Sequence, residues 1–378
     1  MLLRVENFKS IGHMDLRLAS LTILIGPPGG GKSNILDAAA LVGYFARFLR
    51  DEYDVQTSAY EPLPILARFS APQQLFTYGD ITKRVFIELA PEPGKGAALE
   101  LQYSGGSPKA VFNGVTVPWD LILARLPILM ALNFSSFLSA LRRAANNEPL
   151  MEARLYGYDR YGLSSPHCET RLSCGFAARL RGQQSAPYPK NVLSELGWNA
   201  TALAKSVRDV VAELNATLEE LEVGVEVKFL QSGAVVVFDR DYEVESSSVS
   251  DAVFRTLYYL MAVRTSMNYV KLHGLEGRYV VLLEEPEAHV FPYFLSLLAD
   301  YLARAAEHMY VVVTTHNPLF VSMLWDRVKE LKTYYVARDR EGLTRAWEVD
   351  VGKLARDLAT AEDLLYMPPR EVVAKYSA

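Results

Sequence analysis

A glycine-rich segment constrains the fold of this chain more than any other feature. Residues 26–33 read Gly-Pro-Pro-Gly-Gly-Gly-Lys-Ser, and they follow a short apolar run, residues 21–25, that is rich in β-forming side chains. Residues 32–49 then carry apolar side chains at helical spacing. Because clustered glycine and proline interrupt both strands and helices, this segment has to be a turn between the two. The sequence therefore predicts a strand–loop–helix unit, the building block of folds with a parallel sheet.

The spacing within this turn, G-x-x-x-x-G-K-[ST], predicts a phosphate-binding loop. Glycines let backbone N–H groups wrap a phosphate, and the following helix directs its positive N-terminus at the anion. Lys32 can then reach the β- and γ-phosphates, while the Ser33 hydroxyl can ligate Mg²⁺. The alternative is a chance glycine-rich turn. The candidate nucleotide-binding residues are Gly26, Pro27, Pro28, Gly29, Gly30, Gly31, Lys32, Ser33 and Asn34.

The hydrophobic pattern predicts an α/β protein with an insertion. Strands are expected at residues 2–8, 21–25, 84–89, 97–103, 110–117, 225–230, 234–238, 279–283 and 310–314. Helices are expected at residues 32–49, 121–145 and 253–269, and residues 191–221 predict one amphipathic helix or a pair. Strands alternate with helices at both ends of the chain, which indicates a largely parallel sheet around an antiparallel and helical middle.

A second motif places acidic residues at the end of a buried strand. Residues 279–285 read Tyr-Val-Val-Leu-Leu-Glu-Glu, and ligands of open α/β sheets bind at the carboxyl ends of such strands. Glu284 could hold Mg²⁺ through water, and Glu285 could orient or deprotonate an attacking water. His316 ends the next predicted strand, where it could approach a γ-phosphate. Solvated acids and a structural histidine are the alternative interpretations.

Taken together, these motifs resemble the ABC-type ATPase heads of the SMC/RecF/OLD group. The resemblance is carried by residues 5–11, the Walker A loop at 26–33, residues 248–252 with Arg255, the Walker B run at 282–289 and residues 314–318. Walker A and Walker B lie far apart, with a signature-like segment shortly before Walker B, which fits the ABC arrangement. The resemblance implies a P-loop NTPase of the ABC type, with a mixed sheet, an antiparallel β subdomain and a helical insertion. It also implies an N-terminal ATPase lobe at 1–120, a mainly helical insertion at 121–223 and a C-terminal lobe at 224–378.

The resemblance further implies a mechanism. ATP with Mg²⁺, held by Ser33 and Glu284, would lie between Walker A of one subunit and the signature of another. Ser250 and Asp251 would contribute that signature, with Ser250 contacting the γ-phosphate of the partner's ATP. Glu285 would be the catalytic base and His316 the residue that senses the γ-phosphate. ATP binding would thus drive homodimerisation, and hydrolysis would release it.

Several positions depart from the group's pattern. Ala252 stands where a signature glycine is usual, so dimer-dependent hydrolysis is expected to be slow. Glu284 replaces the usual Asp, as expected for the OLD branch, and the D-loop Asp is absent after His289. The Q-loop has no clear counterpart. Gln73 and Gln74 are candidates, with surface polar residues as the favoured interpretation.

The branch within the group follows from what the sequence lacks. It has neither sustained heptads nor a Cys-x-x-Cys hook, and the segment after His316 is too short for a Toprim nuclease domain. Asp239 and Asp241 form an Asp-x-Asp, which is interpreted as a turn and not as a nuclease site. His167, Cys168 and Cys174 are too few for structural zinc, and the cysteines are interpreted as buried or unpaired thiols. We therefore expect an OLD-like ATPase head without its usual effector.

Composition limits the remaining functions. Among 378 residues, 39 are Lys or Arg and 44 are Asp or Glu, giving a net charge of −5, so a protein that coats DNA is disfavoured. Two cysteines and no signal or membrane segment predict a cytoplasmic protein. DNA repair or antiviral defence is the expected setting, with DNA and a separately encoded nuclease as candidate partners. The alternatives are a weakly catalytic nucleotide switch that recruits such an effector and, least favoured, a transporter ATPase.

Overall fold

The architecture is known from a computed structural model. It describes residues 1–46, 68–69, 71–104, 107–117, 139–140, 143, 150–158, 191–195, 197, 199–230, 234–244 and 248–378. Within them lie two six-stranded sheets and one three-stranded sheet.

The central sheet is mostly parallel. Its strands in spatial order are β15 (Thr344–Glu348), β14 (Leu331–Arg338), β3 (Leu21–Ile25), β13 (Tyr310–Thr314), β12 (Tyr279–Glu284) and β8 (Glu152–Tyr156). Only β15 runs antiparallel to its neighbour. Strands buried on both faces need apolar side chains at successive positions, which explains the continuous apolar runs of β3, β12 and β13.

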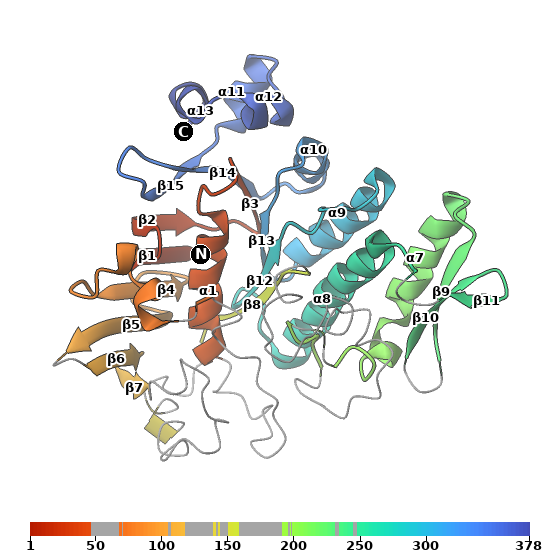
Figure 1. Cartoon of the computed structure of the whole chain (residues 1–378), viewed down its shortest axis with the longest axis horizontal. Coiled ribbons are helices and arrows are strands. Elements are labelled where there is room, and N and C mark those ends of the chain that lie inside the picture. Colours follow the sequence, from red (N-terminus) through yellow and green to blue (C-terminus); the bar gives the residue numbers. More distant parts are fainter. Residues whose placement is uncertain are drawn as a thin grey trace.

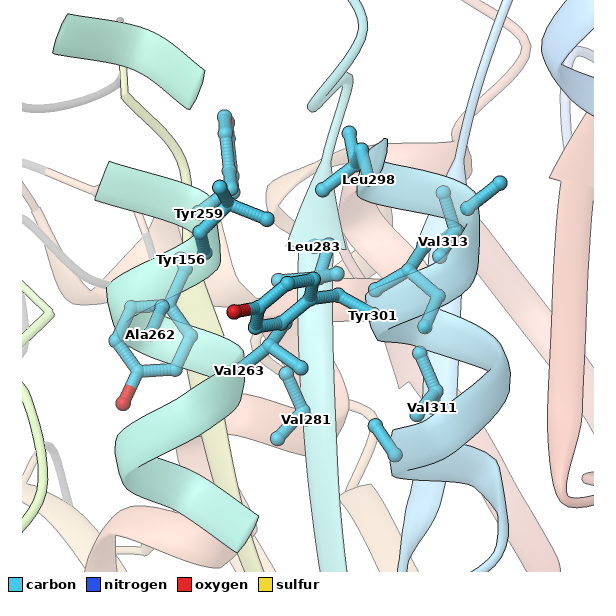
Figure 2. Packing of buried hydrophobic residues seen from close by; sticks show 14 of the residues in the cluster. Tyr156, Tyr259, Ala262, Val263, Val281, Leu283, Leu298, Tyr301, Val311 and Val313 are labelled. Carbon is cyan, nitrogen blue, oxygen red and sulfur yellow. The ribbon is translucent and has the colours of Figure 1, made fainter. Parts of the chain in front are cut away.

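Helices cover the two faces of this sheet. Helix α1 (Lys32–Ala46) packs on one face, where Leu24 and Leu282 belong to its hydrophobic cluster. Helices α8 (Asp251–His273), α9 (Pro292–Ala306) and α10 (Pro318–Arg327) lie on the other face (Figure 1). Figure 2 shows Val263 of α8 and Tyr301 of α9 beside the inward side chains of β12. The strand order and the helical layers bring the carboxyl ends of β3, β12 and β13 to one edge.

The second six-stranded sheet is antiparallel and packs against the other side of α1. Its order is β2 (Ile11–Arg17), β1 (Leu2–Phe8), β4 (Val85–Ala90), β5 (Ala97–Ser104), β6 (Ser107–Phe112) and β7 (Val115–Val117). Two short 3₁₀ turns, Pro72–Leu75 and Thr77–Gly79, precede β4. Helix α1 contacts both sheets and is buried along nearly its whole length.

Smaller elements complete the described chain. A 3₁₀ turn, Ala204–Val207, leads into α7 (Arg208–Glu220), which packs beside β9 (Val225–Phe229). Strand β9 pairs with β10 (Val235–Asp239), which pairs with β11 (Tyr242–Val244). Three short helices end the chain: α11 (Val351–Arg356), α12 (Ala361–Tyr366) and α13 (Pro369–Tyr376). None of the described helices is long and apolar enough to cross a membrane.

The structure confirms most predicted elements and changes several. The parallel strands and the 225–238 hairpin are present, but residues 110–117 form two strands because Asn113 and Gly114 turn the chain. Of residues 191–221, only the C-terminal part is an α-helix. Strand β8 was not predicted, although it closes one edge of the central sheet from within residues 121–223. The predicted helix at 121–145 lies almost entirely outside the described residues, and the lobe boundaries stay a prediction.

Candidate nucleotide-binding site

The phosphate loop connects β3 to α1 at the carboxyl edge of the central sheet. Gly30 N–H donates to the Pro27 carbonyl at 3.1 Å, which closes the turn. Among the described residues, no backbone acceptor faces the N–H groups of Gly29, Gly31, Lys32 and Ser33. The Ser33 hydroxyl likewise has no hydrogen-bond partner there. Unsatisfied N–H groups at a helix N-terminus are what a phosphate binds, so the loop fits the phosphates of a nucleotide.

Lys32 is buried inside this loop. Its side chain is 5% exposed, and its Nζ donates to the carbonyls of Gly26 (2.8 Å) and Pro27 (3.1 Å). Burial lowers the pKa of Lys32 to about 8, against the opposing pull of the carboxylates of Glu285, Glu287 and Glu284. The ammonium is thus near enough to all three acids to be influenced by them. An anion entering the loop would place a negative charge directly beside this ammonium.

Strand β14 forms the back wall of the loop. A Cβ at Gly26 would lie 2.1 Å from the Val336 carbonyl oxygen, and one at Gly30 would lie 2.6 Å from the same atom. A Cβ at Gly31 would meet Thr344 Oγ1 at 2.0 Å. These glycines are therefore required because the loop packs directly on β14 and β15, while Gly29 faces open space at φ 72°.

Three polar residues outside the motif fasten the loop. The Thr344 hydroxyl donates to the Gly30 carbonyl at 3.1 Å and shares a 2.7 Å hydrogen bond with the Ser10 hydroxyl. Asn34 Nδ2 donates to Ser10 Oγ at 2.7 Å. Arg338 Nε donates to the Gly29 carbonyl at 2.9 Å. Sequence reasoning missed Ser10, Arg338 and Thr344, because contacts between residues more than 300 positions apart bring them to the loop.

Glu284 ends β12 beside an arginine. Arg68 Nη1 lies 3.8 Å from Glu284 Oε1, and its Nη2 lies 3.0 Å from Oδ2 of the buried Asp37 on α1. Lys9 also pairs with Asp37, at 2.5 Å. This group of charges connects α1 to the end of β12. Arg68 was not identified from the sequence, and Gln73 and Gln74 are both exposed, in agreement with their interpretation as surface residues.

Glu285 and His316 meet across neighbouring strand ends. His316 Nε2 lies 3.4 Å from Glu285 Oε1, and both side chains are partly exposed. The hydrogen bond from His316 lowers the pKa of Glu285. Glu285 adopts φ 44° and its N–H donates to the Thr314 carbonyl at 3.1 Å, so a strained turn fixes its direction. The two residues singled out from the sequence are therefore brought together.

Glu287 fixes the position of His316 by hydrogen bonds. Its Oε1 accepts from the Thr315 hydroxyl (2.6 Å) and from the His316 N–H (3.0 Å), and the residue is 6% exposed. Burial raises the pKa of Glu287, against these hydrogen bonds. The sequence placed this residue in the Walker B run without a role. Its contacts make it the residue that holds the loop after β13.

The signature-like segment lies at the same edge but faces outward. Ser250 precedes α8 and is exposed, as is Asp251, which pairs with the buried Arg255 at 3.5 Å. Further along α8, the Tyr259 hydroxyl donates to the Glu284 carbonyl at 2.7 Å. Since α8 rises about 1.5 Å per residue, its N-terminus projects beyond the sheet edge. Ser250 and Asp251 therefore make no contact with the phosphate loop of their own chain among the described residues.

Other candidates take no part in this site. Asp239 ends β10, and Arg240 and Asp241 form the turn to β11, which confirms the predicted turn. His167, Cys168 and Cys174 lie outside the described residues. Within the described residues, no three His, Cys, Asp or Glu side chains are grouped to hold a metal ion. A metal bound here would need oxygen ligands from a phosphate, as Mg²⁺ commonly takes.

Comparisons with known proteins give likeness at the level of fold only. No protein-family model matches the sequence, and no curated protein does. An SMC head bound to the C-winged helix domain of ScpA is 14% identical, covers 94% of this chain and 98% of its own, and has a TM-score of 0.49. The SMC head domain from Thermotoga maritima is 14% identical, with coverages of 92% and 98% and a TM-score of 0.42.

A third SMC head, with an extended coiled coil and bound to the C-terminal domain of ScpA derived from Pyrococcus furiosus, is also 14% identical. Its coverages are 94% and 98%, and its TM-score is 0.47. At this identity and these TM-scores, nothing about the activity of this chain follows from the likeness. Its function has to be argued from its own residues.

Proposed function

We propose that this chain is an ABC-type P-loop ATPase that binds and hydrolyses ATP. The observation that carries the proposal is the meeting of four groups at one sheet edge. The unsatisfied loop N–H groups and Lys32 supply the anion site, and Glu285 paired with His316 supplies a base beside it. Phosphoryl transfer to water requires a cation and N–H donors that bind the phosphates, and a carboxylate that positions the attacking water.

The residues divide the chemistry among themselves. The loop and Lys32 bind the β- and γ-phosphates and neutralise their charge. Ser33 and, through water, Glu284 would hold Mg²⁺, which supplies further charge neutralisation when bound. Glu285 orients a water and accepts its proton as the water oxygen bonds to the γ-phosphorus. The bond to the bridging oxygen breaks, leaving ADP and phosphate.

The second half of the site comes from another copy of the chain. Ser250 and Asp251 are exposed, and within the described part of the chain no hydrogen bond or ion pair joins them to the phosphate loop. In this proposal they bind the γ-phosphate of ATP held by a partner, so ATP joins two heads into a homodimer. His316 senses the γ-phosphate, and hydrolysis separates the heads.

A turnover assay with a matched pair of variants tests the proposal. Glu285→Gln keeps the shape of the side chain but removes the base, so steady hydrolysis of Mg-ATP should fall at least roughly 100-fold. ATP binding should persist, and size-exclusion chromatography should show a trapped dimer. Glu276→Gln, an exposed glutamate before β12, should hydrolyse ATP like the wild type. A folded wild type that neither binds nor hydrolyses ATP contradicts the proposal.

A weakly catalytic switch is the second candidate. Ala252 replaces the usual signature glycine, and the segment after His289 begins with Val290 and the exposed Phe291 where a D-loop Asp is usual. Such a chain would use bound ATP to recruit an effector such as a nuclease. Turnover above roughly 1 per minute, against typical enzyme rates near 10 per second, argues for the ATPase.

The wider setting is proposed on motif resemblance alone. We place the chain in the cytoplasm, in an OLD-like branch, acting in DNA maintenance or antiviral defence. DNA and a separately encoded nuclease are its proposed partners. Co-purification with a nuclease encoded next to it would support this setting, and ATP turnover unchanged by DNA and by that nuclease would count against it.

A further inference from the structure

A pocket of about 360 Å³ lies beside the phosphate loop, on the opposite face of the sheet from α1. It is open to solvent and is lined by the end of β14, by β15 and by helix α13, which packs against β14 near the C-terminus in Figure 1. Its volume falls at the lower end of the range for small-molecule sites, about 300–1,000 Å³. Nothing in the proposed ATPase reaction uses this pocket.

The charged lining of the pocket is positive. Arg338, Arg340 and Arg370 all line it, although the chain as a whole carries a net charge of −5. Among the described residues, none of the three forms an ion pair with a carboxylate. The single acid, Asp339, is already engaged: it pairs with Arg345 at 2.8 Å and accepts the N–H groups of Glu341 and Leu343. The lining therefore favours an anion.

Arg338 connects the pocket to the phosphate loop. Its Nε donates to the Gly29 carbonyl at 2.9 Å and its Nη1 donates to the Gly342 carbonyl at 3.0 Å. In the part of the chain that is described, its Nη2 makes no hydrogen bond, which leaves a donor for a ligand. A guanidinium fixed by two carbonyls is preorganised to bind phosphate with its remaining N–H groups.

The other walls of the pocket are apolar and one of them is aromatic. Trp347 of β15, Ala337 of β14 and Val373 of α13 line it, and all three also border the hydrophobic core. The Trp347 indole N–H has no hydrogen-bond partner among the described residues. Arginines facing a tryptophan combine phosphate pairing with ring stacking, the two interactions by which proteins bind a nucleotide unit.

We propose that this pocket binds a nucleoside monophosphate unit, with its base against Trp347 and its phosphate at Arg338, Arg340 and Arg370. This chemistry has two sources, a free mononucleotide and the phosphorylated end of a nucleic acid strand. The proposal does not depend on the ATPase function, because none of the residues that it uses catalyses that reaction.

Binding of AMP to the full-length protein, measured by calorimetry, tests the site. AMP should bind, whereas adenosine and inorganic phosphate, each carrying half of the recognised unit, should bind at least tenfold more weakly. Arg340→Ala and Arg370→Ala replace exposed side chains, so the fold should persist, and each should raise the Kd for AMP at least tenfold. Lys375→Ala removes the same charge from α13 outside the pocket and should leave the Kd within about twofold.

Two further experiments determine whether the ligand is a free mononucleotide or a nucleic acid end, and whether it binds in this pocket. A short single strand with a 5′-phosphate, compared with the same strand without it, detects a nucleic acid end. If only the phosphorylated strand binds, and the arginine variants weaken it, the source is nucleic acid. Lys32→Ala should abolish ATP binding and leave AMP binding intact. The proposed ATP site and the proposed AMP site can therefore be tested independently. Absence of binding by AMP and strand, or AMP binding lost with Lys32→Ala but unchanged by the arginine variants, overturns the proposal.

Discussion

At the scale of single residues, the charge state of Lys32 decides how the site responds to pH. Its ammonium is buried and donates to the backbone carbonyls of Gly26 and Pro27, and burial lowers its pKa to about 8. Below this value the side chain is charged and can bind phosphate. As pH rises through this value, the free protein loses the charge that ATP binding requires.

ATP affinity should therefore fall with rising pH. We expect at least a roughly tenfold loss between about pH 7 and about pH 9.5, measured by calorimetry with constant Mg²⁺ and ionic strength. Lys32→Arg is the matched control, because a guanidinium stays charged over this whole range. That variant should bind ATP with little dependence on pH, and an equally steep decline in it would assign the pH dependence to another group.

Glu287 should matter for position and not for proton transfer. Glu287→Ala removes the acceptor of the buried Thr315 hydroxyl and of the partly buried His316 N–H, which costs about 2–4 kcal/mol of unfolding free energy. Turnover should fall with it, since His316 loses its support. Glu287→Gln keeps an acceptor oxygen and should recover most of both losses, as urea denaturation and turnover would show. Equal stability of the two variants would contradict this role.

At the scale of elements, the β14–β15 hairpin is the part of the fold that shapes the phosphate loop. The backbone of β14 leaves no room for side chains at Gly26 and Gly30, and Thr344 of β15 binds the loop from behind. The loop is thus held in its conformation by a hairpin far away in sequence. Its glycines are needed for this close packing as well as for the close approach of a phosphate.

Thr344→Val tests this dependence. The substitution keeps the branched shape but deletes the hydroxyl that binds the Gly30 carbonyl and Ser10, at a cost of about 1–3 kcal/mol. Amides of residues 26–34 should exchange hydrogen faster, and ATP affinity should fall. Thr116→Val, on the exposed face of the edge strand β7, should change neither. Unaltered exchange in the Thr344 variant would mean that the hairpin does not hold the loop.

The elements also show where sequence reasoning succeeded and why it failed elsewhere. Strands β3, β12 and β13 were predictable because strands buried on both faces are apolar throughout. Strand β8 was not, because its buried positions include Glu152 and Arg154, charges that tertiary partners such as Glu195 accommodate. Likewise, Glu285 and His316 were predictable because each belongs to a motif. Arg68 and Arg338 were not, because only long-range packing brings them to the site.

At the scale of the whole molecule, the two parts of the proposed catalytic unit face different ways. The phosphate loop with Glu285 and His316 forms one part, and exposed Ser250 at the start of α8 forms the other. A head that uses both parts has to meet a second head. The proposed site is therefore shared between chains, and activity should depend on protein concentration.

Mixing two inactive variants tests this sharing. Lys32→Ala lacks the phosphate site, and Ser250→Glu places a negative charge where the partner's γ-phosphate would bind, so each should be nearly inactive alone. Their heterodimer contains one intact site, made of the loop from the Ser250→Glu chain and the signature from the Lys32→Ala chain. Mixing should restore turnover up to about half of the wild-type rate per dimer at saturating ATP. A mixture as inactive as its components would place the entire site within one chain.

The contact between Thr344 and Gly30, 314 positions apart, also has a consequence for how the protein is made. A ribosome releases the phosphate loop well before the hairpin that shapes it, because the two contacting residues are 314 positions apart. Until then the loop and its neighbouring strand β3 lack one side of their final packing, since β14 is the partner of β3 in the sheet. Nascent chains of this protein should therefore acquire the ability to bind ATP late and abruptly, as long-range parallel pairing completes.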